Sequence, residues 1–512
     1  MKLVWVAFLL ASTGLAAIPI EQYNVHDFVF TAAAPGNPFD VALTGEFTGP
    51  GGVRLQVPGF YDGNEHWRIR FSPTILGSWT LRTVSSLPAL NQQAENDISC
   101  IPNRNPNIHG GLGIDPEYPH HFIYADGTRY FLLGYEADWL WGADMLDPKR
   151  KVMNRLIEQL ASHGFNHVMV NVYAYDTRWA PGKSCEWDYG PPAVFPWQGT
   201  NQQPDFSRLN PRFFQIYDGM MEALQDKGIV AHIMFKVYNK KVNWPPKHSR
   251  DEERYFRYVV ARYQAFSNVV WDFSKESYNE KDNLLQSHLT DLIRSTDAYH
   301  RLTTAHDDDV YTWDPDLNRN LDFRTDQQHS DWAEMIAFDR AFRQYPVLNS
   351  EFGYEKGVED LPTHEHRDPW DVQLHRAWLV YMAGGYGVYY YNNTAWDVVK
   401  PDPEPPGMMR FQLIKDLLSK LPYWRMKPAN SLAVGGSCLA LPGEVYVFYV
   451  QGSKLTVNLT GLNVGSGISA YWHDTWTGYR EKASAIHAQV LQTRKPDSFG
   501  SAPGLLIVQR IP

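Results

Sequence analysis

Short runs in which apolar and polar residues alternate fill the chain from about residue 25 to residue 100. In 53–57 and 66–71, for example, every second side chain is apolar. This two-residue period is that of a β-strand with one buried face. Turn-forming segments that contain glycine, such as 49–52 and 62–64, separate the runs. The pattern predicts a small β-sandwich over residues 18–102.

Between about residue 128 and residue 425, short apolar runs alternate with segments of helical periodicity. One such segment ends at Gly164, and another begins with the capping-box pair Ser249 and Glu252. The candidate strands are 130–135, 167–172, 229–235, 269–273, 302–305, 321–323, 347–349 and 387–391. Eight strands in alternation with helices predict an α/β fold, a closed (β/α)8 TIM barrel, over residues 103–425.

Strand patterns return after residue 425, at 438–441, 445–450, 455–459, 469–473 and 505–508. They predict a second β-sandwich over residues 426–512, which either braces the barrel or binds a ligand. The other end of the chain carries Lys2, an apolar run over 3–10 and small residues at 14–17, the pattern of a signal peptide over residues 1–17. This run is shorter than the roughly 20 residues of a spanning helix, so we expect a secreted protein with no membrane contact after cleavage.

The net charge is −10 and the pI is about 6.0, and Lys and Arg do not cluster, which argues against a nucleic-acid partner. The 18 Trp and 29 Tyr are compatible with carbohydrate binding, because aromatic faces stack on sugar rings, but a large core uses the same residues. Cys100, Cys185 and Cys438 allow at most one disulfide, by any of three pairings. Sequons begin at Asn392 and Asn458.

No cofactor or metal motif is recognised in the sequence. Residues 314–325 resemble a calcium loop, but Arg319 stands where the loop needs Gly and Thr325 where it needs Glu. The sequence lacks a Walker loop, a dinucleotide fingerprint and a Gly-x-Ser-x-Gly elbow. We therefore expect chemistry that is performed by side chains alone.

Two acidic residues follow predicted strands at the end where TIM barrels carry their active sites. Glu276 comes just after the fourth strand and Glu351 just after the seventh. Hydrolysis of a glycosidic bond uses such a pair, one carboxyl to protonate the leaving oxygen and one to attack or stabilise the cationic sugar centre. The environment is expected to keep Glu276 protonated and Glu351 ionised.

At these positions the sequence resembles the clan A glycoside hydrolases, and most of all apiosidase-like barrels with a β-sandwich on each side. Trp271, five residues before Glu276, and the apolar pair Val347-Leu348 before Glu351 carry the resemblance. It implies a retaining hydrolase without a cofactor, acting on a plant or microbial carbohydrate. Glu276 would be the acid/base and Glu351 the nucleophile.

One residue departs from the clan's pattern. Members commonly have Asn directly before the acid/base Glu, in contact with the sugar 2-hydroxyl, whereas this chain has Lys275. Recognition at that hydroxyl is therefore expected to differ. The literal Asn-Glu pair occurs downstream as Asn279-Glu280, which makes Glu280 the alternative acid/base.

Other side chains are predicted to line the same rim. The resemblance implies that His329, after strand six, orients the nucleophile and that Trp396, after strand eight, is an aromatic platform for the sugar. Further candidates for substrate binding lie at the other strand ends: Glu136, Asp138, Trp139, Tyr173, Lys236, Lys275 and His306. Each of these is also a reasonable barrel-mouth packing residue.

Two other functions stay open at this point. One is a barrel that has lost catalysis and only binds carbohydrate or matrix, for which Lys275 is the argument. The other is an inverting hydrolase, whose carboxyls lie roughly 6.5–9.5 Å apart instead of the roughly 5–5.5 Å of a retaining enzyme.

Overall fold

The computed structural model describes residues 17–146, 149–178, 185–307, 320–357, 367–401, 405–464 and 467–510. The chain divides into two compact units, residues 1–106 and 107–512. Residues 1–16 of the predicted signal peptide and residues 314–319 of the calcium-like segment lie outside the described residues. Among the described residues, no helix is long and apolar enough to cross a membrane.

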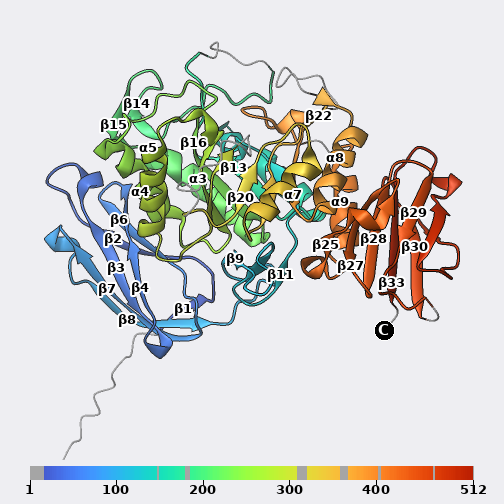
Figure 1. The fold of residues 1–512 in the computed structure, drawn as a ribbon. Coiled ribbons are helices and arrows are strands. Elements are labelled where there is room, and N and C mark those ends of the chain that lie inside the picture. The colour runs from blue at the N-terminus through green and yellow to red at the C-terminus, as the bar shows by residue number, and fades with distance from the viewer. Residues whose placement is uncertain are drawn as a thin grey trace, which may run out of the picture. The chain divides into compact units, whose positions relative to one another are not determined.

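Two sheets make up the first unit, drawn in blue in Figure 1. One has the order β1-β8-β7-β3-β4 and the other the order β2-β6-β5. Their strands are β1 (Ile18–Glu21), β2 (His26–Thr31), β3 (Leu43–Thr48), β4 (Arg54–Pro58), β5 (Phe60–Gly63), β6 (His66–Phe71), β7 (Gly77–Ser85) and β8 (Ala94–Ile101).

Aromatic residues from both sheets form one core in this unit. The rings of Phe47 on β3 and Phe71 on β6 stack with centroids 3.8 Å apart, and Phe28 and Trp79 pack against Phe71. These side chains are buried because alternate residues of each strand face inward. The alternating pattern of the sequence therefore corresponds to an apolar core between two sheets.

The second unit contains the barrel. Its strands, all paired in parallel, are β12 (Gly134–Glu136), β13 (His167–Asn171), β16 (Val230–Val237), β17 (Val269–Lys275), β18 (Thr303–Thr304), β19 (His306–Asp307), β20 (Arg324–Asp326), β21 (Val347–Asn349) and β24 (Tyr386–Tyr390). β18 pairs with β17 and β19 with β20, and only Ala305 separates the two short strands. They act as one fifth strand, so the sheet closes and the predicted TIM barrel is confirmed.

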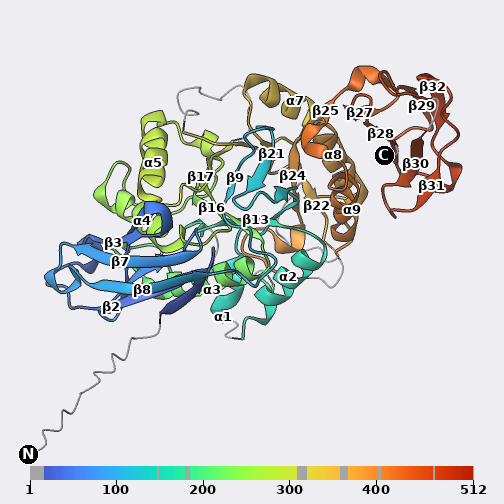
Figure 2. The same cartoon turned by 90° about the horizontal axis from the view of Figure 1, so that it is seen from below.

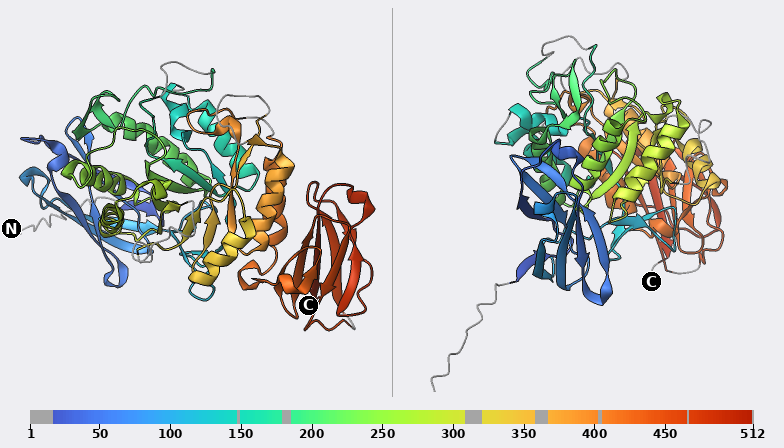
Figure 3. Two further views of the ribbon diagram at one scale, coloured as in Figure 1. Left: turned by 45° about the horizontal axis from the view of Figure 1, so that its top comes forward. Right: turned by 90° about the vertical axis from the view of Figure 1, so that its left-hand side faces the viewer.

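Helices surround these strands in Figures 2 and 3. They are α1 (Ala143–Leu146), α2 (Lys151–Ser162), α3 (Pro211–Asp226), α4 (Arg250–Tyr263), α5 (Asn283–Thr296), α7 (Trp332–Phe342), α8 (Trp370–Met382) and α9 (Met408–Leu418). The predicted cap of α4 forms, since the Ser249 hydroxyl accepts a hydrogen bond from the Glu252 backbone N–H.

Two barrel strands differ from the prediction. Residues 129–130 belong to a small hairpin sheet, made of β9 (Leu112–Ile114), β10 (Phe122–Tyr124) and β11 (Arg129–Tyr130), so the first barrel strand starts only at Gly134. The sixth strand lies at Arg324–Asp326, three residues later than predicted. It has no apolar run because Arg324 and Asp326 are buried as an ion pair.

The C-terminal part of the second unit again has two sheets, of order β25-β27-β28-β33-β30-β31 and β26-β29-β32. Their strands are β25 (Lys427–Pro428), β26 (Ala433–Val434), β27 (Ser437–Leu441), β28 (Val445–Val450), β29 (Lys454–Asn458), β30 (Ile468–Asp474), β31 (Arg480–Lys482), β32 (Val490–Arg494) and β33 (Gly504–Arg510). Tyr449 of β28 stacks on His375 and Trp378 of α8 and hydrogen-bonds His375 over 2.7 Å. This sheet therefore packs on a barrel helix.

The three cysteines are all free thiols. Cys100 and Cys438 are buried, and burial raises the pKa of Cys100 to about 11 and that of Cys438 to about 12. None of the three pairings that the sequence allows is formed in this structure.

Replacing Phe71 by Ala should destabilise the N-terminal unit by about 3–5 kcal/mol, because it leaves a cavity between the two sheets. Hydrogen exchange of the β3 and β6 amides measures the loss. Val29→Ala on β2 is the matched control, since Val29 is 49% exposed and should change the opening free energy by less than about 0.5 kcal/mol. Equal losses in the two variants would contradict the shared aromatic core.

Candidate active site

The carboxyl end of β17 brings a charged pair into the barrel mouth. Lys275 is the last residue of β17, and Glu276 follows in the left-handed conformation, with φ 53° and ψ 52°. Non-glycine residues rarely adopt this conformation, and such strain clusters at functional sites. The Glu276 carboxylate accepts hydrogen bonds from Asn239 Nδ2 at 2.5 Å and Asn279 Nδ2 at 3.1 Å.

The Lys275 ammonium lies among three buried carboxyl groups. It is hydrogen-bonded to Glu136 of β12, 3.5 Å from Asp138 Oδ1 and 3.4 Å from Glu351 Oε2. Asp138 also accepts a hydrogen bond from the Tyr390 hydroxyl at 2.5 Å. Strands one, four, seven and eight thus contribute to one polar cluster, as the barrel geometry predicted.

Burial dominates the pKa values in this cluster. It raises the pKa of Glu136 well above its ordinary value and that of Glu351 to about 7, while the positive charge of Lys275 acts in the opposite direction on both. The negative charge of Glu276 raises the pKa of Glu351 further. Burial would lower the pKa of Lys275, but the surrounding carboxylates raise it above its usual range. The sequence predicts an ionised Glu351 beside a protonated Glu276. With a pKa of about 7, Glu351 is a weaker acid than that expectation requires.

The histidine beside Glu351 is His306, not His329. His306 Nε2 lies 4.0 Å from Glu351 Oε2, 2.9 Å from Gln327 Oε1 and 3.1 Å from the Ser350 hydroxyl. Burial and the charge of Lys275 hold the pKa of His306 well below its ordinary value, so its ring is neutral.

His329 is exposed at the surface. It lies 3.2 Å from Gln327 Nε2 and stacks on Tyr354. Gln327 thus contacts both His329 and His306. The orienting role of His329 therefore stays a prediction, while His306 is the histidine found 4.0 Å from Glu351.

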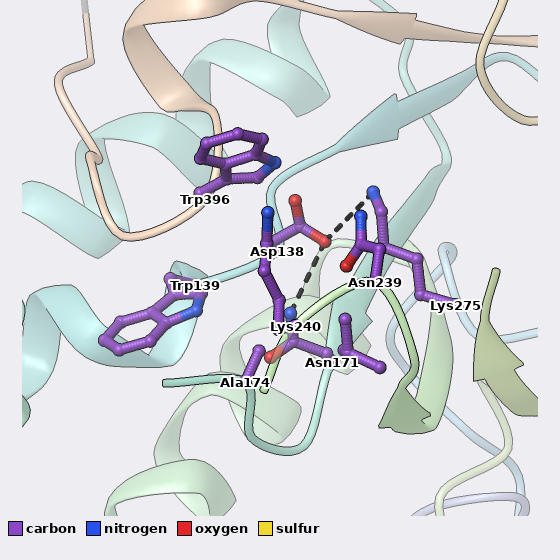
Figure 4. A pocket seen from close by; sticks show the side chains of 9 residues that line it. Asp138, Trp139, Asn171, Ala174, Asn239, Lys240, Lys275 and Trp396 are labelled. Atoms are coloured by element: carbon purple, nitrogen blue, oxygen red, sulfur yellow. Dashed lines mark hydrogen bonds and ion pairs between the residues drawn. The ribbon is translucent and has the colours of Figure 1, made fainter. Parts of the chain in front are cut away.

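A cavity adjoins the cluster. Figure 4 shows Asp138 at its wall, joined to Lys275 and Asn171, with Trp396 and Trp139 on the other side. Trp396 is half-buried, and Lys240 Nζ lies 3.6 Å from the centre of its ring. The remaining lining residues are Ala174, Val237 and Asn239. The predicted Trp139 and Trp396 therefore share a cavity with Asp138 and Lys275.

Two predicted substrate-binding residues lie elsewhere. Lys236 pairs in register with Ser274, and Val237 with Lys275, so Lys236 faces the opposite side of the sheet from Lys275. Its ammonium is buried against Glu252 of α4. Tyr173 donates a hydrogen bond to Asn201 at 2.5 Å and packs edge-on against Trp197 and other rings. Neither side chain lines the cavity.

Glu280, the alternative acid/base, belongs to a different set of contacts. Its carboxylate pairs with Lys247 at 2.6 Å and accepts a hydrogen bond from the Asp282 backbone N–H. Its negative charge also raises the pKa of Tyr238, for which burial is the larger cause. Glu276, by contrast, interacts electrostatically with Glu351. The geometry favours Glu276.

Among the side chains with polar groups in the cavity and the cluster, Asn171, Asn239, Lys240 and Tyr390 were not selected from the sequence. Asn171 ends β13, Asn239 and Lys240 follow β16, and Tyr390 ends β24. Their position at strand ends is the signal that could have identified them.

Comparison with known proteins identifies the family of the barrel. Residues 117–427 match the family described as apiosidase-like, catalytic domain, and residues 19–86 match a domain of unknown function, DUF5060. The chain belongs to the apiosidase-like family. Its barrel is accordingly a catalytic domain of the glycosidase type.

Solved structures share the fold of this apiosidase-like protein. A putative glycoside hydrolase from Bacteroides vulgatus has a TM-score of 0.80 at 22% identity, over 96% of this chain and 100% of that chain. A glycoside hydrolase family 5 protein from the same organism has a TM-score of 0.61 at 18% identity, over 78% of this chain and 94% of that chain. A search of curated proteins found no match.

The two sequons should differ in use if the protein passes through a eukaryotic secretory pathway. Asn392 is fully buried after β24, whereas Asn458 is partly exposed at the end of β29. The folded product should therefore carry a glycan at Asn458 and none at Asn392. Mass spectrometry of Asn458→Gln should show loss of the glycan, with Asn392→Gln as the control. A glycan mass lost from Asn392→Gln would contradict the burial of that side chain.

Proposed function

We propose that this apiosidase-like protein is a secreted, retaining glycoside hydrolase that cleaves a plant or microbial polysaccharide or oligosaccharide. The observation that carries the proposal is the placement of the two carboxyls: Glu276 directly follows Lys275 at the end of β17, and Glu351, two residues after β21, lies 3.4 Å from the Lys275 ammonium. Strands four and seven are those on which clan A hydrolases carry their carboxyls.

Glu351 is the nucleophile in this proposal. Its carboxylate attacks the anomeric carbon while Glu276 donates a proton to the departing glycosidic oxygen. In the second half, Glu276 takes a proton from water, and the water oxygen displaces Glu351 from the sugar. The hydrogen bonds from Asn239 and Asn279 hold the Glu276 carboxyl for both transfers.

The cavity supplies the seat for the sugar. Asp138, Asn171 and Asn239 offer polar groups for hydroxyls, and Trp139 and Trp396 offer apolar faces. Lys240 already covers one face of Trp396, so a stacked sugar displaces it or packs on the opposite face.

We also infer that the flanking sheet pairs are β-sandwiches and that the C-terminal one braces the barrel. The contacts of Tyr449 with His375 and Trp378 support bracing.

A barrel that only binds carbohydrate is the second candidate. The observation in its favour is the Lys275 ammonium 3.4 Å from Glu351, which offsets the charge that a nucleophile uses.

Glu276→Gln should lower hydrolysis by roughly 10²–10⁴-fold, because it removes the proton donor. Glu351→Gln should lower it at least as much. Release of reducing sugar from a panel of plant and microbial glycans measures both. Glu280→Gln, on the Lys247 side, is the matched control and should stay near the wild-type rate. If Glu280→Gln loses hydrolysis while Glu276→Gln retains it, Glu280 is the acid/base.

The first product formed should keep the anomeric configuration of the substrate, since two displacements at one carbon restore it. Proton NMR during the first minutes of hydrolysis, before mutarotation, measures the configuration. An inverted first product would contradict the double displacement. Glu351 would then act as a general base that activates a water molecule.

A further inference from the structure

The Lys275 ammonium is a junction between strands that are far apart in sequence. It contacts Glu136 and Asp138 from the first strand region and Glu351 from the seventh, and it lies 5.1 Å from the centre of the Tyr390 ring on the eighth. Its side chain is only 3% exposed. An ammonium has three N–H donors, and three carboxyl groups surround this one.

We propose that Lys275 is a positioning residue that acts as the internal counter-ion of the nucleophile, holding Glu136, Asp138 and Glu351 in one arrangement instead of binding the sugar. This inference rests on the proposed function, since it concerns the same site. It reassigns Lys275 from the substrate-binding set, because a sugar hydroxyl would have to compete with three carboxyl groups for its donors.

The other groups that face Glu351 do not provide this charge. Burial keeps His306 neutral, and burial together with Asp138 raises the pKa of Tyr390 well above its ordinary value. Glu276 and Asp138 repel a charge on Glu351, and burial raises the pKa of Glu136. Among the described side chains that affect Glu351 most, Lys275 is the cation. Asparagine, usual at this position in the clan, carries no charge.

Removing the ammonium should therefore favour the protonated form of Glu351. Lys275 lowers the pKa of Glu351, which stands at about 7, so its loss raises that pKa. An opposite charge at this distance shifts a carboxyl by about one to three units. The acidic limb of kcat/KM, which requires ionised Glu351, should move to higher pH by the same amount.

The test compares Lys275→Met with Lys275→Arg, which keeps the charge. Infrared titration of the protonated-carboxyl band that disappears in Glu351→Gln measures the ionisation of Glu351 without any substrate. We expect the midpoint to rise by about one to three pH units in Lys275→Met and to stay near wild type in Lys275→Arg. If Lys275→Met does not fold, the double variant Lys275→Met/Glu136→Gln removes the cation together with one carboxyl and should show the same rise.

Lys236→Met is the matched control, because Lys236 is an equally buried lysine on the neighbouring strand, paired with Glu252. It should lower thermal stability without moving the Glu351 midpoint. An unchanged midpoint in Lys275→Met, or an equal shift in Lys236→Met, would overturn the inference. If the Glu351 midpoint rises in Lys275→Met but the wild-type protein hydrolyses none of the glycans, the counter-ion role is supported and the proposed activity is rejected.

Discussion

Closure of the parallel sheet at its fifth strand is the constraint on which the site depends. β18 and β19 each pair with one neighbour, and Ala305 between them keeps both halves on one path. In an open sheet, strands one, four and seven would be separated by the width of the strands between them. In the closed barrel these strands lie around one circle, so their carboxyl ends face one another across the mouth.

A column of hydrogen-bonded polar groups runs through the interior of the barrel. Tyr130, His167, His232 and Asp272 follow one another through hydrogen bonds, and Asp272 accepts the backbone N–H of His306. Burial lowers the pKa of His232 to about 3, so this column holds a neutral ring where a charge would be costly. It ties the floor of the barrel to the strand that carries His306 and supports the residues beside Glu351 from below.

Local patterns made most of the fold predictable, and long-range contacts explain what was missed. Glu276 and Glu351 could be found because strand order alone places them at the same end of the barrel. Arg324 and Asp326 read as loop residues, because their burial depends on each other and on Asp307. Lys236 and Lys275 look alike in sequence, and only the register between β16 and β17 separates their faces. Likewise, strand order could not tell which histidine reaches Glu351.

The left-handed backbone conformation of Glu276 creates a conflict between stability and function at this residue. Glycine would adopt this turn without steric cost, whereas a side chain with a Cβ pays conformational energy there. Selection for stability alone would thus drift toward glycine at 276 and erase the carboxyl. A stabilised descendant of this barrel that keeps glutamate at 276 would show that its lineage continued to need the acid, and a glycine there would mark a scaffold released from catalysis.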